Sequence, residues 1–109
     1  MAKLTRLRYS SKWLLRRVYR VDLTVNDLKI TEVIIDPHYQ EKHQDSLSDK
    51  MILHLVALLD GQDREPDKVV GAFSYYKEEP LYLNGRAYRL IWLLEAGQGY
   101  LGVINAFRR

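Results

Sequence analysis

The densest group of reactive side chains in the sequence lies within residues 36–45, DPHYQEKHQD, which hold two histidines, a tyrosine, a lysine and three acids. Histidine titrates near neutral pH and therefore suits proton transfer. His38 and His43, close to lysine and arginine side chains, could cleave RNA without a metal ion. One imidazole would take the proton of the 2′-hydroxyl, the other would protonate the leaving oxygen, and cations would stabilise the phosphorane.

Two other interpretations of this segment remain open. In one, His38 and His43 bind a metal ion, but they are five positions apart rather than the four of a zinc-binding helix, and no third ligand is evident. In the other, both histidines are structural and hydrogen-bond to loop carbonyls or to the next helix. We expect no metal site and no cofactor, because the sequence has no phosphate-binding loop, dinucleotide fingerprint, nucleophile elbow or EF-hand pattern.

Charge is distributed unevenly along the chain, although its net value is only +3. Residues 1–20 hold seven basic residues and no acid, whereas residues 21–107 hold eight basic and fourteen acidic residues. The chain then ends in Arg108-Arg109. A basic start and end around an acidic body favour a polyanionic partner such as RNA. The alternative is that these charges only keep the chain in solution.

The length of 109 residues allows one hydrophobic core, so we expect a single domain over residues 1–109 in which residues 1–15 form a basic, partly flexible arm. Next to that arm, Arg16 and Arg17 are predicted to bind nucleic acid. The sequence contains no cysteine, no apolar run of the roughly 20 residues that span a membrane, and no signal-peptide core. These features predict a cytoplasmic protein without disulfides and without a membrane partner.

Two segments near the N-terminus have the pattern of paired strands. Residues 18–25 and 28–35 alternate in polarity and are rich in β-branched side chains. Asn26-Asp27 lies between them, and both residues tolerate the positive φ of a two-residue hairpin turn. Asp36-Pro37 ends the second strand, because proline cannot continue the hydrogen-bond ladder. The sequence therefore predicts an N-terminal β-hairpin that leads into the segment His38–His43.

One main helix is predicted over residues 48–59. Its apolar side chains recur at i, i+3, i+4 and i+7 and would form one buried stripe: Ile52, Leu55, Val56 and Leu59. Ser46 or Ser48 can cap its start, and Gly61 is expected to end it.

The C-terminal part predicts a three-stranded antiparallel meander over residues 81–83, 86–95 and 100–108, with its first turn at Asn84-Gly85. Pro80 is expected to break or bulge the first of these strands. The N-terminal β-hairpin, the one main helix and this C-terminal meander together predict an α+β fold, with one curved sheet against the helix.

The register of the meander assigns its side chains to two faces, because successive side chains of a strand alternate. Pairing Leu83 with Arg86, and Glu95 with Tyr100, places one set in the core: Leu81, Leu83, Tyr88, Leu90, Trp92, Leu94, Leu101, Val103 and Phe107. The other face collects Tyr76, Tyr82, Arg89, Ile91, Leu93, Glu95, Tyr100, Ile104 and Arg108. Tyrosines and arginines around an apolar patch could stack bases and bind phosphates. The alternative is an ordinary half-solvated sheet face.

Residues 48–109 resemble a known scaffold. A helix is followed by a strand with Tyr88-Arg89-Leu90-Ile91-Trp92 and by a closing strand that ends in Phe107-Arg108-Arg109, which is similar to the RelE/ParE-type bacterial toxins. The resemblance implies a small basic toxin that cuts RNA without a metal ion, or binds gyrase as ParE-like members do, under the control of a cognate antitoxin protein. It also implies that Arg89 binds phosphate and that the C-terminal group belongs to the site.

We therefore predict a small, toxin-like, metal-independent endoribonuclease that acts on RNA. The predicted catalytic residues are His38, His43, Arg89 and Arg108. The predicted nucleic-acid-binding residues are Arg16, Arg17, Tyr76, Tyr82, Tyr100 and Arg109. The alternative is a non-catalytic module that binds protein or nucleic acid, since fold analogy does not decide function. An enzyme should bring His38 or His43 within about 8 Å of Arg89 or Arg108, because proton transfer acts over a few ångströms.

Overall fold

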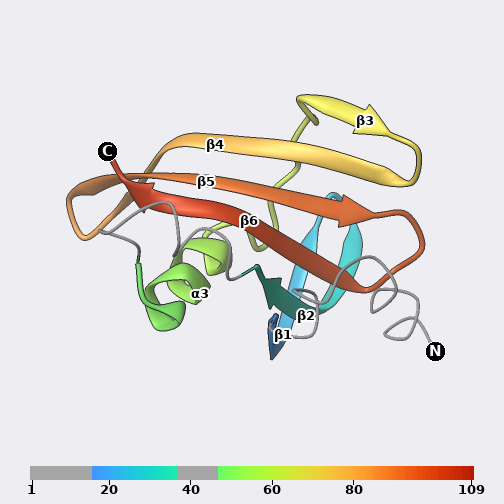
Figure 1. Cartoon of the computed structure of the whole chain (residues 1–109), viewed down its shortest axis with the longest axis horizontal. Coiled ribbons are helices and arrows are strands. Elements are labelled where there is room, and N and C mark those ends of the chain that lie inside the picture. Colours follow the sequence, from blue (N-terminus) through green and yellow to red (C-terminus); the bar gives the residue numbers. More distant parts are fainter. Residues whose placement is uncertain (1–15, 37–46) are drawn as a thin grey trace.

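A computed structural model of the chain describes residues 16–36 and 47–109 (Figure 1). Within these residues, six strands and one helix follow one another along the chain: β1 (Arg17–Val25), β2 (Leu28–Ile35), α3 (Asp49–Ala57), β3 (Lys68–Val70), β4 (Phe73–Leu83), β5 (Arg86–Glu95) and β6 (Tyr100–Arg108). The six strands form one sheet in the spatial order β1-β2-β6-β5-β4-β3.

The predicted α+β fold with a C-terminal three-stranded meander is wrong. The described residues are mostly strand and form a six-stranded mixed sheet that curves like half a barrel, with one short helix. Neighbouring strands are antiparallel except β2 and β6, which are parallel and align Glu32–Ile35 with Tyr100–Val103. This pairing joins segments that are far apart in sequence, and local patterns of polarity do not encode such a partner choice.

The two predicted hairpin turns are confirmed. Asn26 and Asp27 have φ angles of 54° and 60° between β1 and β2, and Asn84 and Gly85 have φ angles of 53° and 78° between β4 and β5. Asparagine, aspartate and glycine tolerate this left-handed region better than other residues. Both turns therefore follow from local chemistry alone.

Helix α3 begins as the sequence predicts. The Ser48 hydroxyl accepts a hydrogen bond from the backbone N–H of Met51 at 3.2 Å, which caps the helix. Ile52, Leu55 and Val56 are buried on its inner side. No helix of the described residues 16–36 and 47–109 is long and apolar enough to cross a membrane.

The helix and one face of the sheet share a single hydrophobic core. Figure 1 shows α3 lying to one side of the sheet, and its buried side chains belong to the same cluster as those of the strands. The fully buried strand residues include Val33, Leu90, Trp92, Leu101 and Val103. We call this the core face of the sheet and the opposite side the outer face.

A β-bulge in β4 decides which of its side chains reach the outer face. The register with β5 shifts between Glu78 and Leu81, so the irregularity predicted at Pro80 is confirmed. As a result, Tyr76 lies opposite Trp92 on the core face, whereas Tyr82 lies on the outer face. The assignment of Tyr76 to the outer face was wrong, because it assumed unbroken alternation through this bulge.

A second bulge, in β6, changes the C-terminal end in the same way. The register with β5 shifts at Ile104, so that Phe107 lies opposite Arg89 on the outer face and Arg108 lies opposite Tyr88. The predicted faces of Phe107 and Arg108 were therefore exchanged. One extra residue in a strand inverts every side chain beyond it.

Candidate functional site

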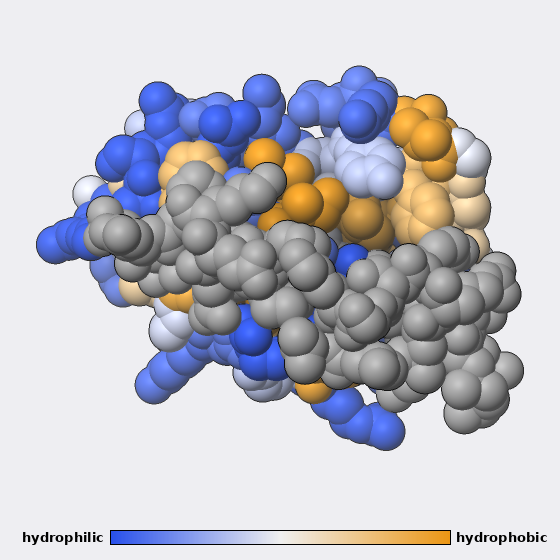
Figure 2. Space-filling model, viewed as in Figure 1, coloured by the Kyte–Doolittle hydropathy of each residue, from blue (hydrophilic) through white to orange (hydrophobic). Residues whose placement is uncertain are grey.

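Basic and aromatic side chains gather on the outer face of the sheet. We call this group the basic–aromatic strip, and it consists of Lys68, Tyr75, Lys77, Tyr82, Arg89, Phe107 and Arg109. Its residues share a face because the ladders pair Lys68 with Tyr75, and Arg89 with Phe107. Figure 2 shows hydrophilic surface along the edge where Figure 1 places β4, with an apolar spot at the end of β3.

One end of the strip is a cation next to an aromatic ring. The Lys68 ammonium lies 5.2 Å from the centroid of the Tyr75 ring, within the range of a cation–π interaction. Lys68 is exposed and Tyr75 is half-buried. Neither residue was predicted to belong to a site, and Tyr76 was expected on this face in place of Tyr75.

The other end holds two arginines around one carboxylate. Glu79 makes ion pairs with Arg89 Nε at 3.5 Å and with Arg109 Nε at 3.1 Å. The Arg89 guanidinium also lies over the Phe107 ring, 5.5 Å from its centroid. Two guanidinium groups thus share one carboxylate at this end, and both arginines remain partly exposed.

Two further strip residues extend from β4 into solvent. Tyr82 is 67% exposed and lies opposite Ala87, while Lys77 is exposed and lies opposite Ile91. An exposed tyrosine on a sheet offers a flat apolar surface that costs little to cover with a base. Of the residues predicted to bind nucleic acid or phosphate, the structure thus brings together Tyr82, Arg89 and Arg109.

Two tyrosines predicted to stack bases are buried instead. The Tyr76 ring is stacked on Trp92 at a centroid distance of 4.0 Å, and its hydroxyl accepts a hydrogen bond from Asn26 Nδ2. The Tyr100 side chain is only 3% exposed, and its hydroxyl donates to Glu95 Oε1 at 2.7 Å. Neither ring offers an open surface to a base, so both predictions are corrected.

Arg16 and Arg17 form ion pairs within the fold. Arg17 donates to both oxygens of Asp49, at 2.5 and 2.9 Å, and so ties β1 to the first turn of α3. The Tyr19 hydroxyl donates to the same carboxylate, and this hydrogen bond raises the pKa of Tyr19. Arg16 pairs with Asp36 at 3.1 Å across the β1–β2 hairpin. These contacts give both arginines a structural role that the charge count alone did not reveal.

The remaining predicted residues lie elsewhere. His38 and His43, like the basic arm of residues 1–15, fall outside the described residues, so their distance to Arg89 stays untested. Arg108 is exposed at the end of β6 but occupies the position opposite Tyr88, on the other side of the strand from Arg89. The described structure therefore does not unite Arg108 with the strip.

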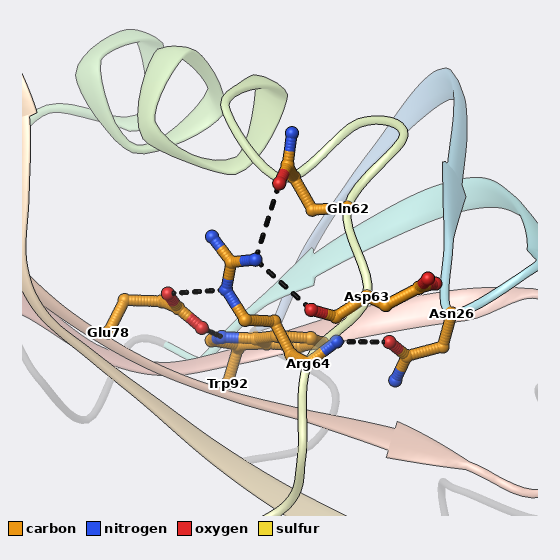
Figure 3. A network of polar contacts seen from close by, with 6 residues as sticks. All are labelled: Asn26, Gln62, Asp63, Arg64, Glu78 and Trp92. Atoms are coloured by element: carbon orange, nitrogen blue, oxygen red, sulfur yellow. Dashed lines mark hydrogen bonds and ion pairs between the residues drawn. The ribbon is translucent and has the colours of Figure 1, made fainter.

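A polar network that the sequence analysis missed lies at the edge of the core (Figure 3). Glu78 is only 9% exposed and accepts hydrogen bonds from Arg64 Nε at 3.0 Å and from Trp92 Nε1 at 3.3 Å. Arg64 also contacts the Asp63 carbonyl and the Gln62 amide oxygen. Buried carboxylates require such partners, and this one anchors the loop before β3 to β4.

The same network reaches the first hairpin. The backbone N–H of Arg64 donates to Asn26 Oδ1 at 2.5 Å, while Asn26 Nδ2 donates to the Tyr76 hydroxyl at 3.0 Å. One asparagine thus sets the β1–β2 turn and links it to the loop and to β4. These hydrogen bonds join the first hairpin, the loop before β3 and β4, so the network has a structural role.

The described residues offer no evident metal centre. Within residues 16–36 and 47–109, no three histidine, aspartate or glutamate side chains lie together as ligands would. A hollow of about 20 Å³ on the outer face, lined by Leu93, Tyr100 and Ile104 among others, has room for a water molecule rather than a nucleotide.

Comparison with known proteins adds no relative: no family model, no curated protein and no solved structure matches this chain. The resemblance to RelE/ParE-type toxins therefore stays a prediction.

Proposed function

We propose that this protein binds RNA through the outer face of its sheet. The observation that carries the proposal is the basic–aromatic strip, in which Lys68 lies next to the Tyr75 ring and Arg89 over the Phe107 ring. Aromatic rings stack bases and cations bind phosphates, and sheets with this combination on one face suit single-stranded RNA. Apart from Arg16 and Arg17, which form ion pairs within the fold, five basic residues in residues 1–20 add attraction for a polyanion.

The salt dependence of binding tests this proposal. Fluorescence anisotropy would follow a labelled single-stranded RNA at several salt concentrations. For single strands, each phosphate contact contributes about 0.7 to the slope of log K against log salt. Lys77→Gln should therefore weaken binding and reduce the slope by about 0.7. Lys50→Gln, the same change on an exposed residue of α3, is the control and should alter neither.

Two results would contradict the proposal. One is the absence of RNA binding at low salt, where electrostatic attraction is strongest. The other is binding that Lys77→Gln and Lys50→Gln weaken equally, since that would place the contact away from the strip.

A second candidate function is metal-independent cleavage of RNA. It is favoured by the Glu79 carboxylate, which lies between the guanidinium groups of Arg89 and Arg109. A carboxylate can accept the proton of a 2′-hydroxyl while arginines stabilise the developing phosphorane charge. His43 would then be the acid. A toxin-like enzyme of this kind would act in the cytoplasm and would bind a cognate antitoxin.

Inducible expression distinguishes cleavage from binding. Cleavage would stop growth and fragment total RNA, and the purified protein would cut RNA in the presence of EDTA. Arg89→Gln and His43→Ala should each abolish these effects without lowering the melting temperature. If growth is normal and RNA stays intact although the protein binds RNA in the anisotropy assay, cleavage is contradicted and RNA binding stands as the function.

A further inference from the structure

The basic–aromatic strip follows the long axis of β4. Its β4 residues Tyr75, Lys77 and Tyr82 lie along the outer face of one eleven-residue strand. Tyr75 and Tyr82 are separated by seven positions, and at about 3.3 Å per residue, less the shortening at the bulge, they lie roughly 20 Å apart. Two stacking surfaces are therefore held at a fixed spacing by a rigid element.

Basic side chains lie next to each of the two tyrosines and between them. Lys68 lies next to Tyr75 on β3, and Lys77 follows two positions after Tyr75 on β4. Arg89 lies two positions beyond Ala87, the partner of Tyr82. The backbone N–H of Arg109 donates to the Ala87 carbonyl at 3.0 Å, which brings the C-terminal arginine to the Tyr82 end.

Negative charge along this path is limited. Glu79 is shared between Arg89 and Arg109, and Glu95 at the far end of β5 accepts a hydrogen bond from Tyr100. A polyanion lying along β4 would thus meet cations at several points, with each carboxylate already bound to a neighbouring donor.

We propose that a single-stranded RNA segment of about six nucleotides lies lengthwise along β4, with one base stacked on Tyr75 and another on Tyr82. The inference rests on the proposed RNA-binding function and adds the orientation of the strand along β4 and its footprint. Successive nucleotides of a stacked strand are about 3.4 Å apart, the closest spacing, so the roughly 20 Å between the tyrosines admits at most about six nucleotide steps. A duplex keeps its bases paired inside and cannot place them on these rings.

A length series of oligouridylates tests this arrangement. Affinity should rise with length and level off at about six nucleotides, because shorter strands reach only one tyrosine at a time. Tyr75→Ala and Tyr82→Ala should each weaken binding of a longer oligonucleotide about tenfold, the effect of losing one stacked base. Tyr82→Phe is the matched control and should bind normally, since stacking does not need the hydroxyl.

The outcomes separate this inference from the function on which it rests. A plateau at two or three nucleotides, unchanged binding of Tyr82→Ala, or equal affinity for a duplex would overturn the lengthwise arrangement while RNA binding stands. No binding at any length would remove the proposed function itself. Because Tyr82 is 67% exposed, its substitution should leave the melting temperature unchanged even if Tyr75→Ala lowers it.

Discussion

At the scale of single residues, two adjacent glutamates show how strand geometry assigns different roles to the same side chain. Glu78 is buried and binds Arg64 and Trp92, whereas Glu79 lies on the outer face and binds Arg89 and Arg109. The first holds the fold together. The second tunes the charge of the basic–aromatic strip.

This difference predicts unequal effects on stability. Glu78→Ala leaves the Nε–H of Arg64 and the Trp92 N–H without their acceptor, so it should lower the free energy of unfolding by about 2–4 kcal/mol. Glu79→Ala removes partly exposed ion pairs and should cost less than about 1 kcal/mol. Urea denaturation measures the free energy of unfolding of both variants. Equal losses would mean that the buried contacts of Glu78 stabilise the fold no more than the exposed ion pairs of Glu79.

Some residues of the basic–aromatic strip could be predicted from the sequence, and others could not, because of the bulge in β4. Arg89 lies on a strand without a bulge before it, so simple alternation placed it correctly on the outer face. Tyr75 was missed because the bulge between Glu78 and Leu81 exchanges the faces of β4. Glu78 was missed as a core residue because its partners Arg64 and Trp92 are each fourteen positions away.

At the scale of elements, helix α3 is held to the sheet by its apolar side and by its first turn. Its stripe could be predicted from periodicity, because side chains three and four positions apart share a helix face. The ion pair of Asp49 with Arg17 could not, because it depends on where β1 lies. Local pattern thus gives the element, and the tertiary fold gives its anchor.

The burial of the apolar side of α3 predicts that two leucine-to-alanine substitutions will differ in their effect on stability. Leu55 is fully buried, so Leu55→Ala should lower the free energy of unfolding by about 2–5 kcal/mol. Leu58, the C-cap residue of α3, is 39% exposed, and Leu58→Ala should lower the free energy of unfolding by under about 1 kcal/mol. Chemical denaturation measures both, and a loss below about 0.5 kcal/mol for Leu55→Ala would contradict the packing of α3.

The anchor of α3 predicts a pH dependence at its junction with β1. The hydrogen bond to Asp49 raises the pKa of Tyr19 above its ordinary value of 10.0, so the folded protein holds this proton more tightly than the unfolded chain. The stabilisation is complete below pH 10.0 and is lost as the pH rises from there through the folded pKa.

Comparison with Tyr19→Phe isolates this effect from the other groups that titrate in alkali. The variant should be less stable than the wild type at neutral pH, because it loses the hydrogen bond. The gap between the two should narrow above pH 10.0 in urea denaturation. A gap that stays constant across this range would show that Asp49 does not hold the Tyr19 proton.

At the scale of the whole molecule, the parallel pairing of β2 with β6 decides the architecture. It joins the N-terminal hairpin to the C-terminal strands and makes one continuous sheet from segments that the sequence presents as separate. The hairpin turns were predictable because each depends on two adjacent residues. The parallel pairing of β2 with β6 was not predictable, because other strands have a polarity pattern that would also suit a position next to β2 or β6. The outer face is continuous across all six strands only because β2 pairs with β6.

The most direct test of RNA binding by the outer face is a titration of ¹⁵N-labelled protein with single-stranded RNA, followed by amide chemical shifts. We expect the largest changes at Lys68, Tyr75, Lys77, Tyr82 and Arg89, with little change along α3. Changes centred on α3, or no changes at an RNA concentration well above that of the protein, would contradict the account.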